Sequence, residues 1–132
     1  MTYRPPDIQT FSASGTWTKP DGAKTIVGHL VGDYLLQNDW MALNKKQSTL
    51  HCAVHCLIWT TCVCLATQCA NPVIIAILFA SHFLQDRTQI IAWYMDAVGQ
   101  KSFRTGACAP WSAIVVDNVF HILTIWFLFR YL

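Results

Sequence analysis

Charged residues are scarce in this sequence of 132 residues. Lys, Arg, Asp and Glu together make up 12% of the chain, whereas hydrophobic residues make up 54%. Typical soluble domains have about 25% charged and about 45–50% apolar residues. Nearly all the apolar residues follow Thr25, in runs of the length that a bilayer requires. The composition and its distribution therefore predict a membrane protein.

Other absences narrow the function classes. The formal net charge is only +2, and the nine Lys and Arg form no basic stripe, which argues against nucleic acid as a partner. The sequence has no glycine-rich phosphate loop, nucleophile elbow or Cys-x-x-Cys pair. We expect no signal peptide, because Arg4-Pro5-Pro6 leads into a polar stretch. The first membrane helix is then expected to direct insertion.

Cysteines are present, but their spacing does not indicate a disulfide scaffold. Five of the six lie on one hydrophobic segment, where helical geometry cannot pair most of them with one another. These are Cys52, Cys56, Cys62, Cys64 and Cys69. We therefore expect free thiols that act as small packing residues rather than as redox groups.

The sequence divides at about residue 23. Residues 1–23 contain Pro and Gly among Ser and Thr, which predicts an extended polar N-terminal arm. The run Thr10–Pro20 within it resembles the opening strand of glycine-rich phage tail-appendage proteins, and this resemblance implies a phage or prophage origin. Residues 24–132 are expected to form a four-helix transmembrane domain.

The expected fold class is all-α, a polytopic membrane bundle of about four helices with an irregular N-terminal arm. Ser48 is a suitable N-cap, and Pro72 and Pro110 are suited to first helical turns. A Gly-x-x-x-Gly step at Gly28 and Gly32 permits close helix contact. The expected helices cover about 24–43, 49–68, 72–98 and 110–132, with a loop at 99–109.

Basic residues indicate the topology. Lys45 and Lys46 in one loop, and Lys101 and Arg104 in another, mark two cytoplasmic loops by the positive-inside rule. We therefore predict a multi-pass membrane protein. Its expected partners are the lipid bilayer and either further copies of itself or a larger membrane assembly.

Histidines and aspartates carry the clearest functional pattern. All five histidines lie four residues from another histidine or an aspartate, and each expected helix has one such pair. Residues four apart share one helix face, and the expected topology brings all four pairs near the cytoplasmic side. The pairs are His29/Asp33, His51/His55, His82/Asp86 and Asp117/His121.

Ionisable groups at membrane depth are costly, so they indicate a functional site. Five imidazoles and three carboxylates are a nitrogen and oxygen ligand set that suits zinc, manganese or iron. We predict that the eight residues form a metal site, although not all of them need be ligands. If the site hydrolyses a phosphoester, the metal would activate water and a spare Asp would act as the base.

Two alternatives stay open at this stage. The pairs can form a hydrogen-bonded network that only locks helices together in a non-enzymatic phage or envelope protein. They can also line a small ion or proton conduit, since intramembrane His and Asp chains serve that purpose too. The sequence indicates the polar network more clearly than its use.

The same residues carry a family resemblance. The motif HLVGDYLLQNDWMA at 29–42, His51 with His55, Ser81-His82-Phe83 with Asp86, and Asp117 with His121 resemble the bacterial and phage family called domain of unknown function 3307. The resemblance covers about Thr25–Leu132 and implies a small polytopic inner-membrane protein with no established activity. A more distant likeness is to membrane-bound metal-dependent hydrolases similar to zinc-dependent phospholipase C, in which His and Asp on helices hold zinc.

Overall fold

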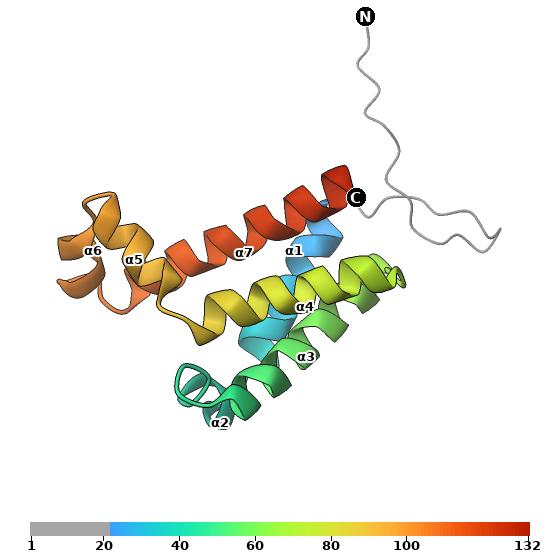
Figure 1. Ribbon diagram of the computed structural model, residues 1–132, viewed down its shortest axis with the longest axis horizontal. Helices are drawn as coiled ribbons and strands as arrows, with labels where there is room; N and C mark the ends of the chain where they lie inside the picture. The colour runs from blue at the N-terminus through green and yellow to red at the C-terminus, as the bar shows by residue number, and fades with distance from the viewer. Residues whose placement is uncertain (1–21) are drawn as a thin grey trace, which may run out of the picture.

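The structure, a computed structural model, describes residues 22–132, and every regular element in this part of the chain is a helix (Figure 1). The all-α prediction is confirmed, whereas the predicted arm and its phage-like run lie outside the described residues, apart from positions 22 and 23. The elements are α1 (Gly22–Leu30), the π-helix η1 (Val31–Leu35), α2 (Asp39–Ala42), α3 (Thr49–Thr67), α4 (Pro72–Arg87), α5 (Ile90–Ala97), α6 (Lys101–Thr105) and α7 (Trp111–Tyr131).

Two of the expected helices are observed almost unchanged, as α3 and α7. The prediction of one continuous helix over 72–98 is wrong, because the helix is interrupted between α4 and α5. Thr88 adopts an extended backbone there, with φ −109° and ψ 174°. Its hydroxyl donates to Leu84 O at 2.6 Å and accepts from Ile90 N at 3.4 Å. Such local bonds compete with the helical ladder, and they end α4 at this residue.

The expected helix 24–43 is also interrupted. α1 continues into the wider turn of η1, which ends at Leu35, and α2 begins only after Asn38. The Asn38 side chain accepts a hydrogen bond from Met41 N at 3.1 Å, as an N-cap does. π-turns occur often at functional sites, and η1 carries Asp33. The predicted loop 99–109 contains α6, which the Arg104–Asp96 ion pair of 2.7 Å ties to α5.

Four segments enclose the centre of the molecule. α1 contacts α3 and α7, and α4 likewise contacts α3 and α7. α5 and α6 lie at one end, beside the start of α7 (Figure 1). An apolar cluster packs between α3, α4 and α7. It is formed by Trp59, Val63, Ile74, Leu78, Ile125, Leu128 and Phe129. All six cysteines are free thiols, as the spacing predicts.

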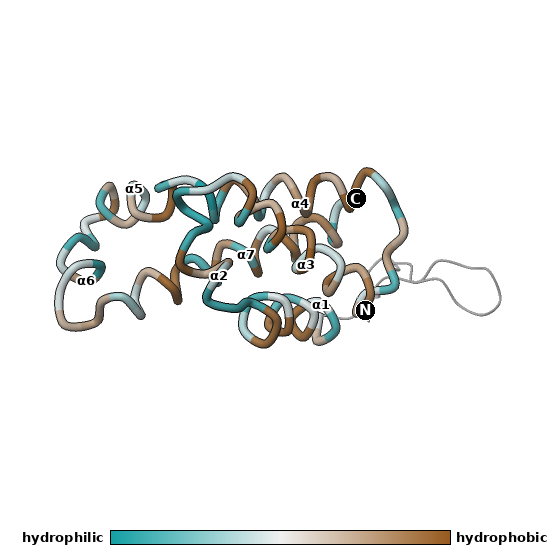
Figure 2. Tube along the Cα trace, turned by 90° about the horizontal axis from the view of Figure 1, so that it is seen from below, coloured by the Kyte–Doolittle hydropathy of each residue, from teal (hydrophilic) through white to brown (hydrophobic). Residues whose placement is uncertain are grey.

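The outside of the described part is strongly apolar. Figure 2 shows hydrophobic residues in brown along α3, α4 and α7, and side chains such as Leu65 and Phe127 are 74% and 60% exposed. α3 and α7 are long and apolar enough to cross a membrane. α4, with 16 residues, is about 24 Å long and shorter than the roughly 30 Å of a hydrocarbon core.

The Gly-x-x-x-Gly step brings α1 against α3. A Cβ atom at Gly28 would lie 2.9 Å from Val63 Cα and 2.9 Å from Ala66 Cβ, and one at Gly32 would lie 2.9 Å from Trp59 Cα. These distances are shorter than van der Waals contact and involve backbone atoms, which cannot swing aside. The predicted close contact is therefore present. It fixes the position of α1 along α3, and so the position of the polar side chains that α1 carries.

We expect Gly28→Ala to destabilise the protein by about 1–3 kcal/mol, because the added methyl overpacks the contact between α1 and α3. Thermal unfolding of the detergent-solubilised protein measures the change. Gly22→Ala is the matched control, since a Cβ there meets nothing within 4 Å. Equal stability of the two variants would contradict the close packing described here.

Candidate metal centre

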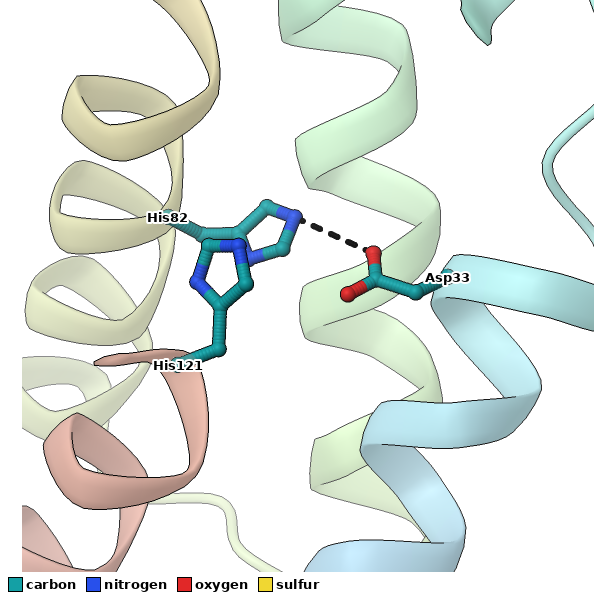
Figure 3. Close-up of side chains that lie close together, drawn as sticks. All are labelled: Asp33, His82 and His121. Carbon is teal, nitrogen blue, oxygen red and sulfur yellow. Dashed lines mark ion pairs between the residues drawn. The ribbon is translucent and has the colours of Figure 1, made fainter. Parts of the chain in front are cut away.

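Histidines and aspartates from α1, η1, α3, α4 and α7 meet in the middle of the molecule. The side chains of His29, His55, His82, Asp86 and His121 are almost completely buried, and Asp33 is nearly so. Figure 3 shows Asp33, His82 and His121 approaching one another from three separate elements. The four predicted pairs therefore do not scatter, because each of the four segments contributes at least one member to the same cluster.

Four ligand atoms form the centre of this cluster. His55 Nε2 lies 3.1 Å from Asp33 Oδ1, 3.0 Å from Asp86 Oδ2 and 3.1 Å from His82 Nε2. His82 Nε2 lies 3.3 Å from Asp33 Oδ1 and 3.3 Å from Asp86 Oδ2. We call these four atoms the central set. Five of the six distances between its members thus fall between 3.0 and 3.3 Å.

The second oxygen of Asp86 faces a different group. Asp86 Oδ1 lies 3.3 Å from His121 Nε2, which lies 3.2 Å from Asp117 Oδ2. The His121 ring is also close to the His82 ring, with centroids 4.1 Å apart. Asp86 therefore touches both the central set and this α7 pair.

His29 supports the cluster from one side. The Trp59 indole N–H donates to His29 Nδ1 at 3.0 Å, and His29 Nε2 lies 2.8 Å from Asn118 Oδ1. An indole nitrogen can only donate, so the His29 proton belongs on Nε2 and donates to Asn118. Both ring nitrogens are thus engaged, while Nδ1 lies 3.3 Å from Asp33 Oδ2. His29 is placed to position its neighbours.

His51 lies apart from the cluster. Its Nδ1 is 2.6 Å from Ser48 Oγ, and its ring centroid is 4.0 Å from that of Trp40. The contact also explains why Ser48 begins α3 without a side-chain cap bond. Seven of the eight predicted residues are brought together, all except His51. One helical turn separates His51 from His55, and the His51 ring therefore lies beside the loop before α3.

Lys45 and Trp59 also belong to the site, and neither is among the eight residues predicted from the sequence. Lys45 Nζ lies 2.8 Å from Asp86 Oδ2. Burial alone would lower the pKa of Lys45, but the neighbouring Asp86 carboxylate outweighs burial and raises it above the usual value. The Trp59 ring stacks on His82, with centroids 3.9 Å apart and an interplanar angle of 14°. No local pattern links these residues to partners more than twenty positions away.

The loop before α3 closes over the end of α4. Lys46 Nζ donates to Asp86 O at 3.0 Å and to Thr88 O at 3.0 Å. The Arg87 guanidinium donates in return to the backbone carbonyl of Lys46. The predicted cytoplasmic loop therefore holds Lys45 against the cluster.

Several buried polar atoms of the cluster make no hydrogen bond of good geometry. Among the described residues these include Asp33 Oδ1, Asp86 Oδ1 and His121 Nε2. Buried polar groups are normally satisfied, so such orphaned ligand atoms at one place fit a bound cation. Three groups could hold a metal ion: Asp33/His82/His121, His55/His82/Asp86 and Asp86/Asp117/His121.

The fold and cluster define an all-helical protein with buried His/Asp groups able to hold a metal ion. Comparison with known families gives a match to residues 23–131 by the family described as protein of unknown function (DUF3307), so the chain belongs to this family. No curated protein matches the chain, and no solved structure does. The family resemblance predicted from the motifs is thereby confirmed.

We expect Trp59→Phe to lower the free energy of unfolding by about 1–3 kcal/mol, because His29 Nδ1 loses its donor inside the protein. Circular dichroism during thermal unfolding in detergent measures the loss. Trp93→Phe is the control, because Trp93 is 69% exposed and its replacement should change stability by less than about 0.5 kcal/mol. Similar losses in both variants would show that the Trp59 hydrogen bond contributes nothing.

Proposed function

We propose that this chain is a membrane protein that binds a divalent transition metal ion in its buried His/Asp cluster. The observation that carries the proposal is the spacing of the central set, in which the two imidazole nitrogens lie 3.0–3.3 Å from each other and from each of the two carboxylate oxygens. Four ligands held tetrahedrally at about 2.0–2.1 Å from zinc lie about 3.3–3.4 Å from one another. The observed spacing supports a site of that size.

Proton arithmetic favours a cation over a hydrogen-bond network. His55 Nε2 and His82 Nε2 lie 3.1 Å apart, and both face the same two carboxylate oxygens. If both nitrogens carry protons, two N–H groups point at each other, and if one is bare, its lone pair faces carboxylates. A metal ion at the centre removes this conflict, because each of the four atoms then offers it a lone pair.

The charge of the cluster points the same way. Three carboxylates, Asp33, Asp86 and Asp117, stand against one ammonium, Lys45. With neutral imidazoles this leaves a formal charge of −2, which is costly to bury without compensation. One divalent cation would balance it. The mixed nitrogen and oxygen donors suit zinc, manganese or iron, the metals predicted from the sequence.

The His82 ring of the central set is held by packing, which suits a preorganised site. His82 lies between the stacked Trp59 ring and the His121 ring. A bound divalent ion would lower the pKa of a coordinated water, the chemistry that a hydrolase needs. Hydrolysis remains a prediction from the sequence, and metal binding is the function that the geometry supports best.

The membrane part of the proposal rests on the inverted polarity of the fold. Charged and imidazole groups lie inside, whereas large apolar side chains cover the outside of α3, α4 and α7. Exposed apolar area of this extent needs a cover, and lipid chains provide it for α3 and α7, the two helices long enough to span. We propose a multi-pass position in the bacterial inner membrane, with α1 and α4 sheltered beside these two helices.

We expect the purified protein to bind about one tightly held zinc, manganese or iron ion, and His55→Ala to weaken that binding by about 100-fold or more, since it removes a ligand. Loss of an outer-shell group already costs about 10–100-fold. Inductively coupled plasma mass spectrometry and metal titration measure the change. His51→Ala is the matched control on the same helix, and it should keep full metal content. Equal behaviour of the two variants, or metal-free wild-type protein, would reject the site.

Membrane integration has its own test. We expect the protein expressed in bacteria to stay in the membrane pellet after an alkaline carbonate wash and to enter the soluble fraction only with detergent, because its apolar surface lies in lipid. Immunoblots of the fractions report the distribution. Release by carbonate alone would contradict integration, without bearing on metal binding.

A further inference from the structure

The carboxylate of Asp86 presents its two oxygens to two different groups of ligand atoms. Oδ2 belongs to the central set, while Oδ1 faces His121 Nε2. We propose a second divalent cation site formed by Asp86 Oδ1, Asp117 Oδ2 and His121 Nε2, so that Asp86 bridges two metal ions. The inference rests on the proposed function, because the second ion lies beside the first.

Distances support this second site. His121 Nε2 lies 3.3 Å from Asp86 Oδ1 and 3.2 Å from Asp117 Oδ2, which is again the separation of ligands around one small cation. These three residues are one of the groups whose ligand atoms could hold a metal ion. The distances between ligand atoms in the second site are therefore similar to those in the central set.

Burial supplies an independent observation. The Asp86 and His121 side chains are each 1% exposed, and both Asp86 Oδ1 and His121 Nε2 lack a hydrogen bond of good geometry. The two unsatisfied atoms lie 3.3 Å apart, one on α4 and the other on α7. If His121 accepted a proton on Nε2, it would still be shared between two carboxylates at 3.2–3.3 Å. A cation between them satisfies all three groups.

The two sites differ in their ligand number. The central set offers four protein atoms, whereas the second site offers three, and three protein ligands with one position left open are the pattern of catalytic sites. Asp117 is 25% exposed, so the second site lies nearer to the protein surface than the central set does. Two metal ions that share a carboxylate typically lie about 3.5–4 Å apart. Any reacting ligand would reach the second ion.

The charges of the cluster determine which of the two ions binds more tightly. The first divalent ion balances the formal charge of −2 that the carboxylates and Lys45 leave. The second ion then enters a neutralised cluster, and it would share the Asp86 carboxylate with the first ion and with the Lys45 ammonium, which is 2.8 Å from Asp86 Oδ2. We therefore expect two affinities, with the second weaker than the first.

Manganese titration of the chelator-stripped full chain in detergent tests this inference. We expect two ions in the wild-type protein, and an exchange-coupled manganese pair by electron paramagnetic resonance. Asp117→Asn and Asp117→Ala should weaken the second ion about tenfold or more, leave the first affinity unchanged and abolish the coupling. Asp96→Asn is the control, because that carboxylate pairs with Arg104 on the surface and should leave both ions bound.

The outcomes separate the two proposals. One manganese ion in the wild-type protein, with Asp117 variants unchanged, would overturn the second site and leave the proposed function standing. Two ions with unchanged affinities and coupling in the folded Asp117 variants would overturn the assignment of Asp117. No bound manganese, zinc or iron would overturn the proposed function itself. Circular dichroism of each variant shows that it is folded before its metal content is compared.

Discussion

The Asp86 carboxylate is the group on which the interior depends. It is buried at the end of α4 and lies within 3.3 Å of His55 on α3, His82 one turn earlier on α4 and His121 on α7, with Lys45 Nζ at 2.8 Å. A buried carboxylate without partners costs several kcal/mol. The helices must therefore meet at the height of Asp86, and the loop before α3 must fold back to deliver Lys45.

The rest of the fold positions the side chains that surround Asp86. Gly28 and Gly32 let α1 lie directly against the backbone of α3, and the wide turn of η1 follows, carrying Asp33 inward beside His55 and His82. Trp59 then joins two parts of the cluster, since its indole N–H binds His29 and its ring stacks on His82. Steric closeness and hydrogen bonding thus act on the same few side chains.

Polarity is inverted relative to a soluble domain, and this inversion connects the membrane proposal with the metal proposal. A low-dielectric surrounding strengthens the attraction between a cation and its ligands and raises the cost of leaving carboxylates unpaired. The two proposals therefore support each other, because an apolar exterior in lipid would strengthen the binding of a divalent ion by two imidazoles and two carboxylates. In a network held by protons alone, the Nε2 atoms of His55 and His82 would still face each other at 3.1 Å.

The sequence by itself determined the helical class, the extents of α3 and α7, the family and the four pairs of ionisable residues, because composition, proline positions and the i,i+4 spacing are local properties. Only the tertiary structure showed that His55 belongs to the cluster and His51 does not, and that both nitrogens of His29 are hydrogen-bonded. It also showed that the helix is interrupted at Thr88 and that Lys45 and Trp59 belong to the site. Those outcomes depend on which helices touch and at what depth. Two histidines one turn apart are equivalent in a sequence pattern, whereas in the folded chain one faces Asp86 and the other lies against Trp40.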